Sequence, residues 1–320
     1  MAAKRTTAFI ALLLFTAVLL GACTAKQTGQ PTTAGGSAET SPGAASGTKG
    51  TLTVGAKDFT EQFLMGEMYA LLLENAGYQV TRKFNISSAI PVIHDALRNG
   101  EIDLYPEYTG TALTSMLKQK SKDDESDYKA VKQAYQSQWQ LTWLDTAPAN
   151  NTYAVATTKA VADKYKLTSM SDLAKRAAEL RFLAVGRFLV SPEDGLPGMV
   201  RVYGDFPFKA AKQVGYGVQY MALLRGEAEA VVVFGTDGEI KAHDLVVLKD
   251  DKHLWPSYYL APIVRQSVLD KDAEIAQLLN RLSKIVTDDA MRSMNWEVTG
   301  NKKPYARVAK EFLRKEGLLK

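Results

Sequence analysis

The segment ALRNGEIDLY spans residues 96–105, and a weaker version of it, LLRGEAEAVV, spans residues 223–232. Each copy combines the end of a helical pattern, a glycine, two acidic residues and an apolar run typical of a buried strand. Each run leads into a turn rich in threonine and glycine, YTGT at 108–111 and FGTDG at 234–238. The repeat predicts two similar lobes that each offer one turn and one helix start to a shared cleft. The alternative is that helix, glycine and strand form a common unit whose recurrence has no further meaning.

The sequence around the first copy alternates strand-like and helical patterns. Strand patterns cover residues 52–56, 79–84 and 102–105, and helical patterns cover 63–77 and 89–98. Asp58 and Glu61 have the spacing of a capping box at the start of the first helix. The alternation resumes after Tyr153, with strand patterns at 182–186 and 230–234, and the end, 273–319, is mostly helical. This order predicts the α/β class, with helices on both faces of open sheets and ligands beyond the carboxyl ends of the strands.

The first 23 residues form a segment of a different kind. Lys4 and Arg5 precede an apolar run over 8–20, and LGAC follows at 20–23. These features are typical of a secretory signal peptide over 1–22, and the run is short for a permanent membrane span. The small residues before Cys23 match a bacterial lipobox, which makes Cys23 the predicted lipidated first residue. The alternative is an ordinary signal peptide that happens to contain a cysteine.

Residues 24–49 consist almost wholly of Thr, Ala, Gly, Ser, Pro and Gln. Such a segment buries too little apolar surface to offset the entropy of ordering it, so we expect residues 23–50 to be a lipidated cysteine followed by a flexible linker. A linker of this length spans roughly 25–30 Å. The prediction is a folded body anchored to the cell membrane by lipid, outside the cytoplasm.

Composition narrows the function of that body. The chain has 39 basic and 35 acidic residues, a formal net charge of +4, and loss of the signal lowers it to +2. The basic residues are dispersed, so we expect no nucleic-acid partner. His94, His243 and His253 are far apart, so we expect no metal site, and a lone cysteine at position 23 excludes a disulfide or thiol chemistry in the body.

Several stretches resemble the substrate-binding lipoproteins of bacterial ABC importers for osmoprotectants, the binders of glycine betaine, choline and carnitine. The resemblance covers nearly all of 51–318. It rests on GAKDFTEQ at 55–62, GEIDLYPEYTGT at 100–111, NTY at 151–153, DGLPG at 194–198, TDG at 236–238 and PSY at 256–258. The run 105–111 is its most specific part.

The resemblance implies a two-lobed periplasmic-binding-protein fold of type II with two crossovers between the lobes. Lobe 1 would comprise 51–153 and 262–320, and lobe 2 would comprise 154–261. It also implies that the body captures a quaternary-ammonium ligand and delivers it to an ABC permease. The sequence has no Walker-type phosphate loop and no membrane bundle, so permease and ATPase are expected on separate chains, and no cofactor is expected.

The chemistry of a betaine selects candidate ligand-binding residues. Aromatic faces attract a trimethylammonium group, which has no N–H, whereas its carboxylate needs an ammonium, hydroxyls or a helix start. Tyr108 and Tyr258 are the candidate ring walls, and Phe234 is a third. Lys57 with Thr111 is the candidate carboxylate clamp. The remaining candidates are Ser87 and Ser88 as hydroxyl donors, and Asn151 and Asp237 as support for the cleft or hinge.

Each candidate has an ordinary structural alternative. The two tyrosines could be half-buried packing rings, Lys57 a solvated surface lysine, and Phe234 a core residue. Thr111 could cap the helix that begins there, and Asp194 and Asp237 could cap helices or hold turns. Asn151 could pin the crossover between the lobes.

Two positions depart from the pattern of several tyrosines that the resemblance implies. They fall on Ala147 and Leu196, which have no aromatic face. The cage would then hold a bare trimethylammonium group less well, so either the affinity is low or the ligand is a bulkier betaine, such as a trimethylated histidine derivative. Because Lys57 would repel a plain cation, a zwitterion such as glycine betaine is favoured over choline.

Two other classes of function compete with ligand delivery. An enzyme would need a nucleophile with a base in reach, and neither a Gly-x-Ser-x-Gly elbow nor a histidine in a recognisable nucleophile motif occurs. A structural surface lipoprotein would have its cleft filled or fixed shut. We therefore expect a binding protein and no enzyme.

Overall fold

The computed structural model describes residues 48–320. The predicted signal peptide, the predicted lipidation of Cys23 and nearly all of the predicted linker lie outside these residues. No helix in the described part is long and apolar enough to cross a membrane.

The first lobe is built on a five-stranded sheet with the order β2-β1-β3-β10-β4. Its strands are β1 (Thr51–Gly55), β2 (Gln79–Lys83), β3 (Leu104–Tyr108), β4 (Leu141–Trp143) and β10 (Leu260–Arg265). β1 is parallel to β2 and β3, and β10 is antiparallel to β3 and β4. The strands carry apolar residues toward cores on both faces, which confirms the predicted α/β class for this half.

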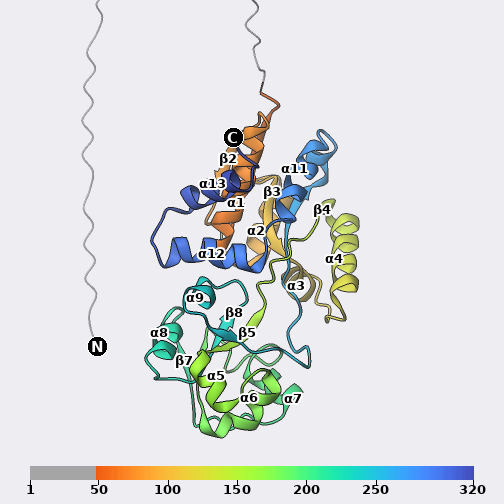
Figure 1. Cartoon of the computed structure of the whole chain (residues 1–320). Helices are drawn as coiled ribbons and strands as arrows, with labels where there is room; N and C mark the ends of the chain where they lie inside the picture. The colour runs from red at the N-terminus through yellow and green to blue at the C-terminus, as the bar shows by residue number, and fades with distance from the viewer. Residues whose placement is uncertain (1–47) are drawn as a thin grey trace, which may run out of the picture. The chain divides into compact units, whose positions relative to one another are not determined.

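The second lobe repeats this plan in the order β7-β6-β8-β5-β9. Its strands are β5 (Tyr153–Thr157), β6 (Arg181–Val185), β7 (Ala210–Val214), β8 (Ala230–Phe234) and β9 (Val246–Val247). β6 is parallel to β7 and β8, and β5 is antiparallel to β8 and β9. In Figure 1 the first sheet lies among orange, yellow and blue segments, and the second among green and teal ones.

Helices cover both faces of each sheet. Those of the first lobe are α1 (Thr60–Asn75), α2 (Ile90–Arg98), α3 (Thr109–Thr111) with a π-helical turn at Ala112–Met116, α4 (Asp124–Trp139), α10 (Gln266–Leu269), α11 (Glu274–Ser283), α12 (Asp288–Thr299) and α13 (Tyr305–Lys315). Those of the second are α5 (Lys159–Tyr165), α6 (Met170–Arg176) with a 3-10 turn at Ala177–Glu179, α7 (Leu196–Tyr203), α8 (Val218–Leu224) and α9 (Gly238–Ala242).

The two copies of the sequence repeat occupy equivalent places. The first leads from α2 through Gly100 into β3, and the second leads from α8 through Gly226 into β8. Both glycines have positive φ angles, 77° and 69°, which glycine adopts without strain. β3 and β8 are the central strands of their sheets, and each pairs antiparallel with the strand that follows a crossover. The repeat therefore marks corresponding parts of two similar lobes.

The strand expected at 102–105 instead runs from Leu104 to Tyr108. Asp103 is held by hydrogen bonds with Thr53, of which one goes to the Asp103 carboxylate, so regular pairing begins one residue later. At the other end, Pro106 faces Pro262 on β10, so two residues that lack an N–H share one position of the ladder. The strand therefore extends to Tyr108, which lies at its carboxyl end.

Two crossovers, residues 144–152 and 248–259, connect the lobes. Residues 150–152 of the first contact residues 256–259 of the second. Asn150 and Tyr259 form an antiparallel bridge, and the Asn150 side chain accepts the backbone N–H of Tyr258 at 2.7 Å. Thr152 donates to the carbonyl of Pro256 at 2.8 Å. α12 forms a further connection, because it packs on α9 of the second lobe as well as on α1 and α13. Figure 1 shows α12 directly beside α9.

Candidate functional site

A cavity of about 590 Å³ lies between the lobes, within the range of roughly 300–1,000 Å³ that is typical of small-molecule sites. Six aromatic side chains line it, Phe59, Tyr108, Tyr153, Tyr216, Phe234 and Tyr258. Its charged lining comprises Lys57, Glu61, Asp194, Asp237 and Glu239. Hydroxyl and amide groups of Thr60, Ser88, Thr111, Asn151, Thr236, Asn295 and Thr299 complete the polar lining.

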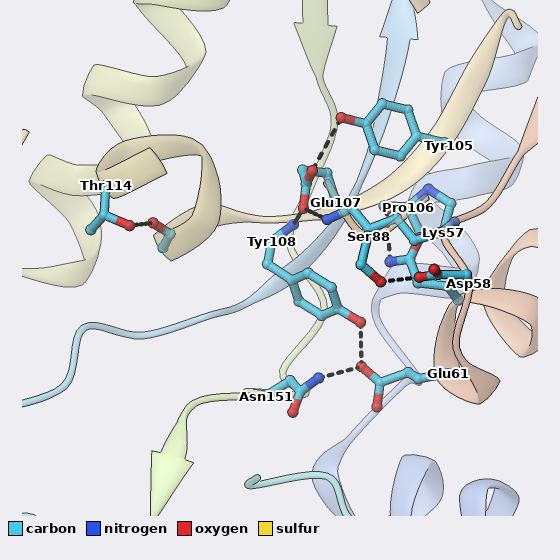
Figure 2. A network of polar contacts seen from close by, with 12 residues as sticks. Lys57, Asp58, Glu61, Ser88, Tyr105, Pro106, Glu107, Tyr108, Thr114 and Asn151 are labelled. Carbon is cyan, nitrogen blue, oxygen red and sulfur yellow. Dashed lines mark hydrogen bonds and ion pairs between the residues drawn. The ribbon is translucent and has the colours of Figure 1, made fainter. Parts of the chain in front are cut away.

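Lys57 and Glu107 form a buried ion pair beneath Tyr108. Lys57 Nζ lies 2.5 Å from Glu107 Oε1, and the two side chains are 3% and 0% exposed. Glu107 also accepts the Tyr108 N–H at 2.7 Å and the Tyr105 hydroxyl at 3.1 Å, as Figure 2 shows. The alternative of a solvated Lys57 is therefore wrong. Its ammonium is already compensated by a carboxylate, and the pair fixes the end of β3.

Glu61 is the centre of a second buried network. The Tyr108 hydroxyl donates to Glu61 Oε1 at 2.7 Å, and Asn151 Nδ2 donates to the same oxygen at 3.3 Å (Figure 2). Asn295 Nδ2 donates to Glu61 Oε2 at 3.0 Å and to the carbonyl of Thr236 at 2.9 Å. Burial raises the pKa of Glu61, and the hydrogen bonds oppose this shift. The network joins α1, β3, one crossover, α12 and the second lobe.

This arrangement overturns the predicted capping box. α1 begins after Phe59, which makes no side-chain capping bond, and Asp58 instead accepts the hydroxyl of Ser88. Glu61 faces the cavity network rather than the helix start. The sequence spacing was right for a cap, but three donors from distant segments compete for the carboxylate and hold it there.

Asp237 organises the aromatic wall of the second lobe. Its carboxylate accepts the Phe234 N–H at 2.7 Å, the Tyr216 hydroxyl at 2.5 Å and the Tyr220 hydroxyl. Burial raises the pKa of Asp237 to about 6, and the tyrosine hydrogen bonds oppose this shift. Asp237 makes no side-chain cap to α9, so it holds the turn after β8 and braces Tyr216.

The aromatic walls come from both lobes. In the second lobe, Phe234 lies 4.9 Å from Tyr153 and 6.3 Å from Tyr216 between ring centroids. In the first lobe, Phe59 stacks on Tyr108 with centroids 6.3 Å apart. Tyr258 lies on the second crossover and packs against the core of the first lobe. Tyr258, which falls inside the range 154–261 predicted for lobe 2, therefore adds its ring to the side of the first lobe, and the rings from the second lobe are Tyr153, Tyr216 and Phe234.

Most of the candidates from the sequence line this one cavity: Lys57, Ser88, Tyr108, Thr111, Asn151, Phe234, Asp237 and Tyr258. Ser87 is not among the lining residues, and its hydroxyl accepts the N–H of Ala89 at 3.0 Å. Thr111 lies inside α3 and makes no capping bond, so the capping alternative is wrong for it. Ala147 and Leu196, the two positions that depart from the implied aromatic pattern, are not among the lining residues.

The sequence prediction missed five lining residues that matter, Phe59, Glu61, Tyr153, Tyr216 and Asn295. Tyr216 had a usable signal, because it stands between Gly215 and Gly217 at a strand-to-helix turn, where an aromatic ring has little reason to be buried. Asn295 had none, since a polar residue in a helix is ordinarily solvated. Among residues 48–320, no group of three or more His, Cys, Asp and Glu side chains is placed to hold a metal ion.

Comparison with known proteins identifies the family. The family described as the substrate binding domain of ABC-type glycine betaine transport systems matches residues 50–315. The chain belongs to this family. It is 35% identical to the ergothioneine transport permease/ergothioneine binding protein of Helicobacter pylori over 267 residues. The matched segment covers 83% of this chain but only 48% of that protein. The chain therefore spans about half the length of that relative.

Two further similarities agree with this membership. The carnitine transport binding protein of Listeria monocytogenes is 31% identical over 277 residues, which cover 86% of this chain and 89% of that protein. A crystal structure described as a glycine betaine/carnitine/choline ABC transporter superposes with a TM-score of 0.79 at 31% identity, over 83% of this chain and 99% of that one. These findings confirm the predicted resemblance and the two-lobed type II fold. The family is one of transport substrate-binding proteins.

Proposed function

We propose that this protein captures a betaine-type quaternary-ammonium ligand in the cavity between its lobes. The observation that carries the proposal is the set of six aromatic side chains from both lobes and a crossover around one cavity. Each aromatic face that meets a desolvated quaternary nitrogen contributes about 2 kcal/mol or more, and carboxylates nearby favour the same charge. The names of the Helicobacter and Listeria relatives, which state ergothioneine and carnitine, support a betaine.

The acidic end of the ligand is assigned to the side of Lys57 and Thr111, with Ser88 as a further hydroxyl donor. Since Lys57 is paired with Glu107, a ligand carboxylate there shares the ammonium with Glu107 rather than meeting a free charge. This favours a ligand with a weakly held carboxylate and a large cationic part. A betaine bulkier than glycine betaine is therefore the second candidate, and the cavity volume of about 590 Å³ supports it.

The protein's place in the cell follows from the same function. We place it outside the cytoplasm, anchored by a lipid on Cys23, where it delivers the ligand to an ABC permease driven by a separate ATPase. Closure of the lobes around the crossovers is the step that the ligand stabilises. No catalytic role is assigned to any residue.

Isothermal titration calorimetry of the purified full chain tests the proposal. The panel contains glycine betaine, choline, carnitine and the trimethylated betaine of histidine, with proline as a ligand that has no quaternary nitrogen. We expect saturable binding of at least one quaternary ammonium compound and none of proline. Binding of no compound with a quaternary nitrogen would refute the assignment.

A further inference from the structure

Two asparagine side chains on the cavity wall, Asn151 and Asn295, donate hydrogen bonds through the amide nitrogen. Asn295 Nδ2 donates to Glu61 Oε2 at 3.0 Å and to the Thr236 carbonyl at 2.9 Å. Asn151 Nδ2 donates to Glu61 Oε1 at 3.3 Å. The partners are all acceptors, so neither amide can be turned around without placing its oxygen against another oxygen. The orientation of both amides is therefore fixed by Glu61.

The oxygen of each amide has no hydrogen-bond partner among the described residues. Asn151 Oδ1 and Asn295 Oδ1 are both buried and unpaired, and Asn295 as a residue is only 7% exposed. Other buried groups without partners occur in the described part of the chain, but only these two belong to residues that line the cavity. A buried acceptor without a donor is unfavourable, so each such group needs an explanation, and beside a ligand cavity a donor on the ligand can supply the missing partner.

The surroundings of the two oxygens contain further acceptors. Glu61 lies between the two amides, and Asp237 and Glu239 line the same cavity from the second lobe. Among the described residues, Lys57 is the single cationic side chain on the lining, and its ammonium is engaged by Glu107. The lining next to Asn151 and Asn295 thus offers more acceptors than donors, and a quaternary nitrogen carries no N–H to satisfy them.

We propose that the ligand carries an O–H or N–H group in addition to its quaternary nitrogen, and that this group donates to the amide oxygens of Asn151 and Asn295 beside Glu61. This inference rests on the proposed function and narrows it. Glycine betaine has neither an O–H nor an N–H and leaves both oxygens unpaired. Hydroxylated betaines such as carnitine and betaines with a ring N–H satisfy them. A site with buried acceptors rejects the analogue that lacks the donor.

Matched ligand pairs test the proposal by calorimetry on the full chain. The first pair is carnitine and γ-butyrobetaine, which differ only by the hydroxyl. The second is the trimethylated betaine of histidine and its analogues that carry one methyl group on one ring nitrogen, which lack the ring N–H and keep the ring neutral. We expect the donor-bearing member of at least one pair to bind about tenfold more tightly or better, and the responding pair identifies O–H or N–H as the donor.

The outcomes separate the two proposals. Equal binding within both pairs, or tighter binding of glycine betaine than of every donor-bearing ligand, would overturn this inference while leaving the quaternary-ammonium function in place. Binding of none of these compounds would overturn both.

Variants locate the donor's partner. In Asn295→Ala, the affinity ratio within the responding pair should fall toward one, and Asn151→Ala should lower it as well. The ratio is measured inside one variant, so a general loss of affinity or stability does not move it. Asn301→Ala removes an exposed amide that bonds Glu297 away from the cavity, and should keep the wild-type ratio. An unchanged ratio in both Asn151→Ala and Asn295→Ala would show that these oxygens do not receive the donor.

Discussion

The hydroxyl of Tyr108 donates to the carboxylate of Glu61 at 2.7 Å, and both residues are only 4% exposed. The bond connects the end of β3 with the first turn of α1 inside the cavity wall. The ring of the same tyrosine lies 5.2 Å from the Lys57 ammonium and stacks on Phe59. Tyr108 therefore contributes to the aromatic wall through its ring and to the acid network through its hydroxyl, and substitutions can separate the two contributions.

Tyr108→Phe should lower the free energy of unfolding by about 1–3 kcal/mol, because a buried carboxylate loses a donor while the aromatic face remains. The affinity for a quaternary ammonium ligand should change by less than about tenfold, whereas Tyr108→Leu should lower it by at least about tenfold. Urea unfolding and calorimetry measure the two effects.

Tyr69→Phe is the matched control for the loss of a hydroxyl. Tyr69 is fully buried in the core of the first lobe, and its hydroxyl has no partner among the described residues. Its removal should therefore cost far less than that of the Tyr108 hydroxyl. Equal losses in the two variants would show that the bond to Glu61 contributes nothing to stability.

The buried pair of Lys57 and Glu107 should show strong coupling. Lys57→Gln leaves an uncompensated carboxylate whose side chain is 0% exposed, so we expect the free energy of unfolding to fall by about 3–5 kcal/mol. Adding Glu107→Gln removes the stranded charge and should restore much of the loss. A double variant as unstable as the sum of the two single variants would mean that the pair is not coupled.

The same double variant reports on the ligand's acidic end. If Lys57 binds a ligand carboxylate, the folded variant with both Lys57→Gln and Glu107→Gln should still bind betaines more weakly than wild type. Its affinity for choline, which has no carboxylate, should be nearly unchanged. Calorimetry with both ligands measures this difference. Parallel loss for betaine and choline would instead assign Lys57 a purely positioning role under Tyr108.

The fold could be predicted from the sequence because its signals are local. The glycine within each repeat and the apolar run after it predicted β8 at its observed bounds and β3 within three residues at either end. Tyr108, Tyr258 and Asp237 were found because they follow strands or turns, and the carboxyl ends of strands converge on the cleft.

The rest of the site depends on contacts between distant segments. Glu61 occupies a capping position by sequence, and only its donors Tyr108, Asn151 and Asn295 hold it at the cavity. Lys57 had an equally good case as a surface lysine, because its partner Glu107 is 50 residues away. Local patterns carry no information about such long-range pairings, so the acid network could not be derived from them.

The acidity of Asp237 predicts how stability depends on pH. Burial raises its pKa from 3.8 to about 6, so the folded state binds the proton more tightly than the unfolded chain does. Its contribution to stability is fully present below pH 3.8 and is lost as the pH rises through about 6, with a total of about 3 kcal/mol. The raised pKa values of Glu61 and Glu239 act in the same direction.

Asp237→Asn should therefore reduce the fall in unfolding free energy between pH 4 and 7, as measured by urea unfolding at a series of pH values. Asp163→Asn, which removes an exposed carboxylate paired with Lys159 on α5, should leave the wild-type slope. A cationic ligand should also bind wild type more tightly as the pH rises through the same range, because ionised Asp237 favours it. A slope that is identical in wild type and Asp237→Asn would contradict the assignment.

Gly238 is where α9 of the second lobe meets α12, and it should control closure of the lobes. A Cβ at this position would lie 2.5 Å from the backbone nitrogen and 2.8 Å from the Cα of Trp296. Backbone atoms cannot yield as a flexible side chain does, so Gly238→Ala should force α9 and α12 apart. Two hydrogen bonds cross the same junction, from Asn295 to the Thr236 carbonyl and from Arg292 to the Gly235 carbonyl. Both should weaken when the helices separate.

The expected result is a population of more open molecules, with a larger radius of gyration by small-angle X-ray scattering and a ligand affinity lowered by about tenfold or more. Gly204→Ala is the control, because Gly204 has a φ of 91° but nothing within 4 Å of an added Cβ. It should cost stability through local backbone strain without changing the radius of gyration. If Gly238→Ala binds ligand like wild type and scatters like it, the junction of α9 and α12 does not hold the cleft closed, and closure must depend on the crossovers alone.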